Sequence, residues 1–116
     1  MKHLIASLLA VLLAVAALSA APRKQTFTGT ITDNMCATTG HASMRMGPTD
    51  AECTIACIGA HGATYVLLRG KDVYILSDQR TPEQFAGQKV RIVGTLDAKT
   101  RTIQVDSIRT AANAGR

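Results

Sequence analysis

Residues 26–32 read Thr-Phe-Thr-Gly-Thr-Ile-Thr, and this stretch decides the fold class. Phe27, Gly29 and Ile31 alternate with threonines at every second position. Successive side chains of a β-strand point to opposite faces, so the alternation predicts a half-buried strand with Phe27 and Ile31 toward a core. A β-rich domain is therefore the starting hypothesis.

Further along the chain, four stretches predict partner strands. Gly70-Lys71 separates two of them, and glycine in the first position suits a tight two-residue hairpin turn. Val90 and Ile92 alternate with charged residues in a third, and Ile103 and Val105 share one face of a fourth. The predicted strands are residues 26–32, 63–69, 72–77, 88–96 and 101–108.

Between the third and fourth of these strands, residues 81–87 read Thr-Pro-Glu-Gln-Phe-Ala-Gly and predict one short helix. Thr81 is the expected cap, Pro82 occupies the first helical position, and Gly87 ends the helix. Five strands with this helix match the small Greek-key barrel called the OB-fold. We predict an all-β domain with short helices, built as a five-stranded OB-like barrel; a simple antiparallel sandwich is the competing architecture.

The beginning of the chain has a different character, which we interpret as a secretory signal peptide. Met1-Lys2-His3 is positive, residues 4–18 are apolar apart from Ser7, and small residues follow where a peptidase would cut near Ala20 or Ala21. A membrane span needs roughly 20 apolar residues, and no cysteine stands beside the cleavage site for lipid attachment. We therefore predict a periplasmic or secreted protein without a membrane span after cleavage. Its expected parts are a signal peptide at residues 1–21, an OB-like domain at 22–110 and a disordered tail at 111–116.

The charge and aromatic content argue against a nucleic-acid partner. The net charge of +5 comes from lysines and arginines scattered among acidic residues, and the chain has only two Phe, two Tyr and no Trp. A nucleic-acid surface would combine clustered basic residues with stacking aromatics. The charge pattern indicates solubility and identifies no protein partner.

The connection between the first two predicted strands, residues 34–62, concentrates the reactive side chains. A connection this long inside a compact domain is usually functional. It carries all three cysteines, three of the four methionines and two of the three histidines: Cys36, Cys53, Cys57, Met35, Met44, Met46, His41 and His61. We therefore predict a Cys/His/Met-containing loop and helix inserted between strands one and two.

Within this insertion, residues 49–59 predict a helix that begins at a capping box from Thr49 to Glu52 and ends at a glycine. Cys53 and Cys57 are then four residues apart on one helical face, with Cβ atoms about 5–6 Å apart. A disulfide needs about 3.5–4.5 Å, so the two thiols converge more easily on a metal ion. Cys36 and His41 complete a Cys3His set, a composition of tetrahedral zinc sites.

The metal could be zinc or copper, because Met44 and Met46 add thioethers that suit copper(I). Packing beneath the loop is the alternative role of both methionines, and Met35 is expected in the core. Asp33 could act as a hydrogen-bond acceptor for His41 or as a turn cap. His61 is expected to end the helix exposed to solvent, with a ligand role as the alternative.

Two other functions remain open. An exported domain is commonly stapled by a disulfide, here Cys36 to Cys53 or Cys57, which would leave one free thiol and an interaction or ligand-binding role without metal. A cysteine-dependent enzyme would pair a thiol with a histidine, but the sequence lacks a nucleophile elbow, a phosphate loop and a Cys-x-x-Cys motif.

Several motifs together resemble a family of small exported bacterial domains of uncharacterised function. The motifs are Gly29-x-Ile-x-Asp33-x-x-Cys36, His41, Cys53-x-x-x-Cys57, Ala63-x-Tyr-Val-Leu, Phe85-Ala-Gly-Gln-Lys-Val90 and Val93-Gly-Thr-Leu. The resemblance implies a barrel-like strand pattern and export but no activity. It also implies that Asp33, Cys36, His41, Cys53 and Cys57 form one set.

Overall fold

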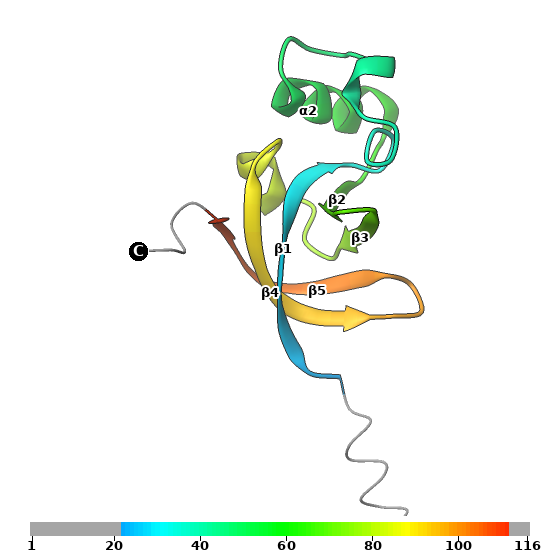
Figure 1. Ribbon diagram of the computed structural model, residues 1–116. Helices are drawn as coiled ribbons and strands as arrows, with labels where there is room; N and C mark the ends of the chain where they lie inside the picture. Colours follow the sequence, from blue (N-terminus) through cyan, green and yellow to red (C-terminus); the bar gives the residue numbers. More distant parts are fainter. Residues whose placement is uncertain (1–21, 112–116) are drawn as a thin grey trace, which may run out of the picture.

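The computed structural model describes residues 22–111, drawn in colour in Figure 1. The predicted signal peptide lies outside these residues, as does the predicted tail apart from Ala111. Among the described helices, none combines the length and apolar character needed to cross a membrane.

The five predicted strands form a closed barrel in the order β1-β2-β3-β5-β4. β1 pairs with both β2 and β4, so the sheet closes on itself and the alternative of a simple sandwich is wrong. All neighbouring pairs are antiparallel except β3 and β5, which confirms the OB-like Greek-key prediction. The strands are β1 (Lys24–Asp33), β2 (Tyr65–Arg69), β3 (Asp72–Leu76), β4 (Lys89–Asp97) and β5 (Thr102–Thr110).

The barrel interior is filled by apolar side chains and two tyrosine rings. As the alternation predicts, Phe27 and Ile31 point inward and are at most 1% exposed. Each such fully buried side chain stabilises the fold by roughly 1.5–3 kcal/mol. The core consists of Phe27, Ile31, Tyr65, Leu67, Tyr74, Leu76, Ala86, Val90, Ile92 and Ile103.

Two glycines allow neighbouring strands to approach closely. A Cβ atom on Gly29 would lie 2.5 Å from the Leu68 carbonyl oxygen, and one on Gly94 would overlap the carbonyl of Gln104. Gly94 also stands at an irregularity in the β4–β5 pairing. Glycine is therefore required at these two points where the neighbouring strand approaches closely.

The predicted helix after β3 is the 3-10 helix η2 (Thr81–Phe85), with Pro82 in its first turn. The expectation that Thr81 caps it is wrong, because Thr81 is already inside the helix. Asp78 takes the capping role, since its Oδ1 accepts hydrogen bonds from the backbone N–H groups of Arg80 and Thr81 at 2.9 and 3.0 Å. An aspartate two to three residues upstream satisfies donors that the helix itself leaves free.

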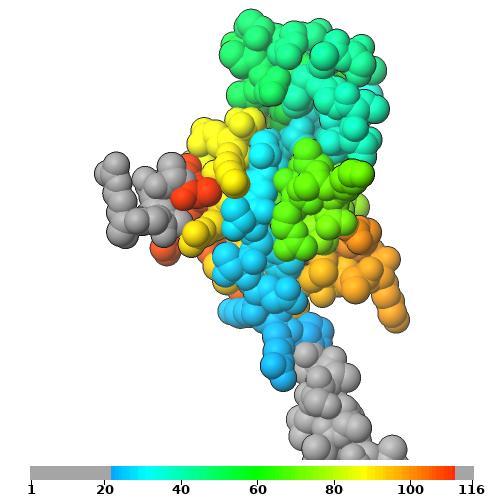
Figure 2. All heavy atoms as spheres, in the orientation of Figure 1, coloured from blue at the N-terminus to red at the C-terminus, as the bar shows by residue number. Residues whose placement is uncertain are grey.

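The insertion after β1 folds over one end of the barrel, in the teal and green part of Figures 1 and 2. It contains the short 3-10 helix η1 (His41–Ser43) and the α-helix α2 (Asp50–His61). The Thr49 side chain accepts a hydrogen bond from the Glu52 N–H at 3.2 Å, as the capping box predicts. The helix continues past Gly59 and ends at Gly62, whose φ of 64° is left-handed. It is therefore longer than predicted, because Gly62 rather than Gly59 adopts the terminating conformation.

Candidate metal centre

The candidate centre lies where the insertion meets the end of β1. Asp33, the last residue of β1, is fully buried, and its Oδ1 accepts hydrogen bonds from the backbone N–H groups of Met35 and Cys36, both at 3.0 Å. This turn directs Cys36 inward, where it is 3% exposed. Asp33 thus has the turn-capping role that was one of its two predicted roles.

Helix α2 supplies the other two thiols from the face that it turns toward the molecule's interior. Cys53 and Cys57 are both 0% exposed, as expected for residues four apart on one face. Ala51 and Ile58 pack against the barrel core and fix the helix there. The three cysteines are free in the described part of the chain, with no disulfide between them.

His41, the first residue of η1, contributes an imidazole. Its Nε2 lies 3.3 Å from the Thr32 hydroxyl, so one ring nitrogen is occupied. Its Nδ1 is buried and has no hydrogen-bond partner. When Nε2 carries the proton toward Thr32, Nδ1 presents a lone pair, which is the usual arrangement of a metal-binding histidine.

These side chains form two overlapping groups of ligand atoms. Cys36, His41 and Cys53 make one group, with ligand atoms all within 4.8 Å of one another. Asp33, Cys36 and Cys57 make a second group within the same limit. Cys36 belongs to both, whereas Cys53 and Cys57 fall in different groups. The structure therefore groups Cys36 with His41 and Cys53, and also with Asp33 and Cys57, and no single group holds all four predicted ligands.

Two orphaned atoms make this cluster fit a cation. Asp33 Oδ2 and His41 Nδ1 are both buried without a hydrogen-bond partner, and Asp33 and His41 each belong to one of the two groups. A buried polar atom without a partner is costly, and an unpaired buried carboxylate especially so. Coordination to a cation would give each of these atoms a partner.

The electrostatics keep the thiols of Cys36 and Cys57 protonated in the absence of a cation. Burial raises the pKa of Cys36 to about 11, and the nearby Asp33 carboxylate adds to the rise. Burial and Asp33 also raise the pKa of Cys57. A buried thiol with a raised pKa is a poor nucleophile. These properties do not favour a catalytic cysteine.

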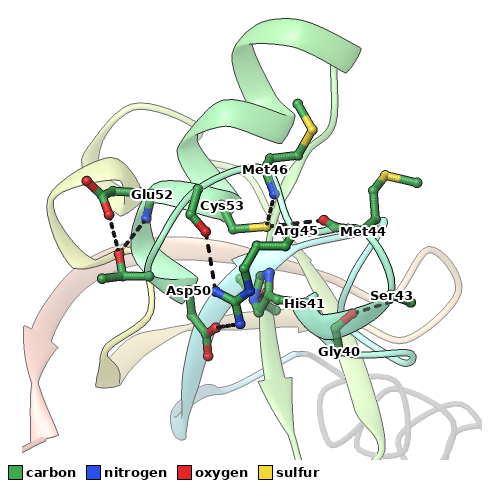
Figure 3. A network of polar contacts seen from close by, with 12 residues as sticks. Gly40, His41, Ser43, Met44, Arg45, Met46, Asp50, Glu52 and Cys53 are labelled. Atoms are coloured by element: carbon green, nitrogen blue, oxygen red, sulfur yellow. Dashed lines mark hydrogen bonds and ion pairs between the residues drawn. The ribbon is translucent and has the colours of Figure 1, made fainter.

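Cys53 has the most defined hydrogen bonds of the three thiols (Figure 3). Its Sγ accepts a hydrogen bond from the Met46 N–H at 3.3 Å and donates to the Met44 carbonyl at 3.4 Å. The loop before α2 thus positions Cys53 through its backbone.

The side chains of Met44 and Met46 do not help to position Cys53. The Met44 and Met46 thioethers point away from the Cys53 sulfur in Figure 3, and these residues are 44% and 37% exposed. The expectation that they pack beneath the loop is therefore wrong. Met35 is 39% exposed and is not in the core, because Asp33 turns the chain so that Cys36 faces inward instead. His61 is exposed in the last turn of α2, as expected, and belongs to neither group.

Thr32 and Thr54 contribute to this region without having been predicted. Thr32 is 4% exposed and contacts His41, although the alternation of β1 placed it on the outer face. It is buried because the insertion covers the end of that face. Thr54 is 0% exposed, and its hydroxyl lacks a partner. The only sign in the sequence was that Thr32 directly precedes Asp33, a predicted member of the site.

Fold and cluster together define a small OB-like barrel domain with a thiol-rich insertion between its first two strands. Residues 60–111 match a family described as "Protein of unknown function (DUF5818)". The match supports the predicted resemblance to a family of uncharacterised function, and it spans β2 to β5. Cys36, His41, Cys53 and Cys57 lie outside the matched stretch. No curated protein and no solved structure is significantly similar to this chain.

Proposed function

We propose that this protein is an exported, periplasmic or secreted, domain that binds a soft metal ion, zinc or copper, through Cys36, His41, Cys53 and Cys57. The proposal of export depends on the signal-peptide pattern of residues 1–21. The proposal of metal binding depends on the cluster at the end of β1.

One observation carries the metal proposal: His41, whose buried Nδ1 has no hydrogen-bond partner, groups with Cys36 and Cys53 as possible metal ligands within 4.8 Å of one another. Thr32 occupies the opposite ring nitrogen at 3.3 Å. A histidine that served only packing would leave this buried nitrogen without a partner, which is costly. Sulfur and imidazole together are the ligands that zinc and copper prefer.

The alternative functions have less support. A reactive cysteine enzyme needs an accessible thiolate, whereas all three thiols are buried and the pKa values of Cys36 and Cys57 are raised. A disulfide-stapled domain would use two of these cysteines, but all three are free. Copper coordination by the methionine thioethers has less support, because the side chains of Met44 and Met46 are exposed.

The test is elemental analysis with a free-thiol count on mature protein purified from an exporting host without chelators. Stoichiometric zinc or copper, with thiols protected until a chelator is added, is expected. His41→Ala should lower the bound metal content, whereas His61→Ala, a matched change at an exposed histidine of the same insertion, should leave it unchanged. N-terminal sequencing of the same protein checks export, with a start near Pro22 expected.

Two outcomes would overturn the metal proposal. One is a metal-free protein with a single free thiol and two cysteines oxidised, which indicates the disulfide-stapled alternative. The other is equal metal loss in His41→Ala and His61→Ala, which would place the metal outside the cluster. A mature protein that still carries residues 1–21 would overturn the export proposal alone.

A further inference from the structure

The division of the cluster into two groups has a direct consequence for how many ions it holds. With the side chains where they lie, a single tetrahedral ion would need all its ligand atoms in one group. Instead, Cys53 shares its group with His41, and Cys57 shares its group with Asp33. The only shared ligand is Cys36. A thiolate can bridge two metal ions because its sulfur has more than one lone pair.

Asp33 is the second reason to expect more than one ion. Its side chain is 0% exposed, its Oδ1 is fully engaged by two backbone N–H groups, and its Oδ2 has no partner. The three salt bridges of the described residues all involve other acidic side chains. A buried carboxylate without a cationic partner is rarely tolerated. A carboxylate oxygen of Asp33 lies within 4.8 Å of the Cys36 and Cys57 sulfurs, so a cation bound there would pair with Asp33.

On the basis of the proposed function, we infer that the cluster holds two zinc ions bridged by the Cys36 thiolate. One ion is bound by Cys36, His41 and Cys53, and the other by Asp33, Cys36 and Cys57. Three protein ligands and one open position is a composition known for zinc.

Charge balance and ligand chemistry both favour two zinc ions. Three thiolates and one carboxylate carry four negative charges, which two divalent ions neutralise and one does not. Uncompensated charge in a buried site is strongly unfavourable. Zinc accepts sulfur, nitrogen and oxygen ligands, whereas copper(I) favours sulfur over carboxylate. The presence of Asp33 therefore selects zinc for the second position.

Native mass spectrometry of the mature protein titrated with zinc measures the number of ions directly. Two zinc ions are expected for the unaltered chain. Asp33→Asn keeps an acceptor for the Met35 and Cys36 N–H groups but removes the ligating carboxylate, so one zinc ion should remain. Cys57→Ser should likewise retain one ion, and Cys36→Ser should lose both. His61→Ala is the control and should retain two.

The outcomes separate this inference from the proposed function. One zinc ion in the unaltered chain and one in Asp33→Asn would overturn the two-ion inference and leave the metal-binding proposal standing. Two ions in Asp33→Asn would also overturn it, since Asp33 would not be a ligand. No zinc and no copper in the unaltered chain would overturn both proposals.

A measurement on the unaltered chain guards against variants that fail to fold. Cadmium is a spin-active substitute for zinc, so the protein loaded with ¹¹³Cd should give two NMR signals with different shifts, because the two ligand sets differ. A bridging Cys36 sulfur should couple the two signals to each other. A single signal, or two signals without coupling, would overturn the bridged arrangement.

Discussion

The barrel and the insertion bury different kinds of atoms. The barrel interior consists of aliphatic and aromatic side chains. The buried residues of the insertion are three cysteines, Ala37 and Thr54, beside Thr32 and Asp33 at the end of β1. A hydrocarbon interior is stable by burial alone, since roughly 25 cal/mol is gained per Å² of apolar surface. An interior of thiols and unpaired polar atoms needs a further partner to become comparably stable.

The barrel and the insertion therefore have separate roles. The closed barrel is a scaffold that holds the end of β1 in place, and the insertion builds the cluster on that end. Ala51 and Ile58 are its apolar anchors on the barrel core. The following predictions test whether the regions depend on different interactions, from the largest expected effect to the smallest.

Removing the central aromatic of the barrel should destabilise the whole domain. Phe27→Ala is expected to lower the free energy of unfolding by about 3–5 kcal/mol, because it leaves a cavity where the ring packs. Urea unfolding followed by circular dichroism measures this loss. Ile75→Ala, at a strand residue that is 43% exposed, is the control and should cost less than about 1 kcal/mol. Equal costs at the two positions would contradict the hydrocarbon-core account.

Removing the metal should instead act on the insertion. Free zinc at a hundred times its dissociation constant stabilises the bound state by about 2.7 kcal/mol, equivalent to about a hundredfold in an opening equilibrium. Chelation should therefore speed amide hydrogen exchange in α2 by up to about a hundredfold, and in β2 much less. An equal change in α2 and β2 would show that barrel and insertion unfold as one unit.

The cap of α2 should have an intermediate and local effect. Thr49→Ala removes the acceptor for the Glu52 N–H and should cost about 1 kcal/mol. Thr49→Ser retains a hydroxyl and should behave like the unaltered chain. Hydrogen exchange in α2 would report the loss, whereas unchanged exchange in Thr49→Ala would mean that packing of Ala51 and Ile58 alone holds the helix.

The smallest expected effect concerns Asp78 on the barrel side. Hydrogen bonds from Thr81, with the backbone N–H of Arg80, hold the pKa of Asp78 below its usual value. A carboxyl with a lowered folded-state pKa stabilises the protein above its unfolded pKa of about 3.9, and this contribution is lost as the pH falls through the folded value.

Asp78→Asn removes the titration and keeps an acceptor. The difference in unfolding free energy between the unaltered chain and this variant should therefore shrink as the pH is lowered from about 5 to about 3. Its size should be about 0.5 kcal/mol or less, as for other surface substitutions. Urea unfolding at each pH measures it, and a difference that grows toward low pH would contradict the assignment.

The sequence predicted the elements that depend on local periodicity. The alternation around Phe27 identified β1, the Gly70-Lys71 turn identified the β2–β3 hairpin, and the Thr49–Glu52 pair identified the start of α2. The predictions were wrong at helix ends, where either of two residues close in sequence could form the cap. Gly62 rather than Gly59 ends α2, and Asp78 rather than Thr81 caps η2.

For the candidate centre, the sequence by itself determined which residues could take part. The spacing of Cys53 and Cys57 placed both on one helical face, because the period of a helix is fixed by its backbone hydrogen bonds. Only the tertiary structure decided which ligand atoms meet. The loop from residue 34 to 49 has no repeating pattern that fixes its path, so the approach of His41 to Thr32, the burial of Asp33 Oδ2 and the outward position of the methionines follow from how that loop folds against β1.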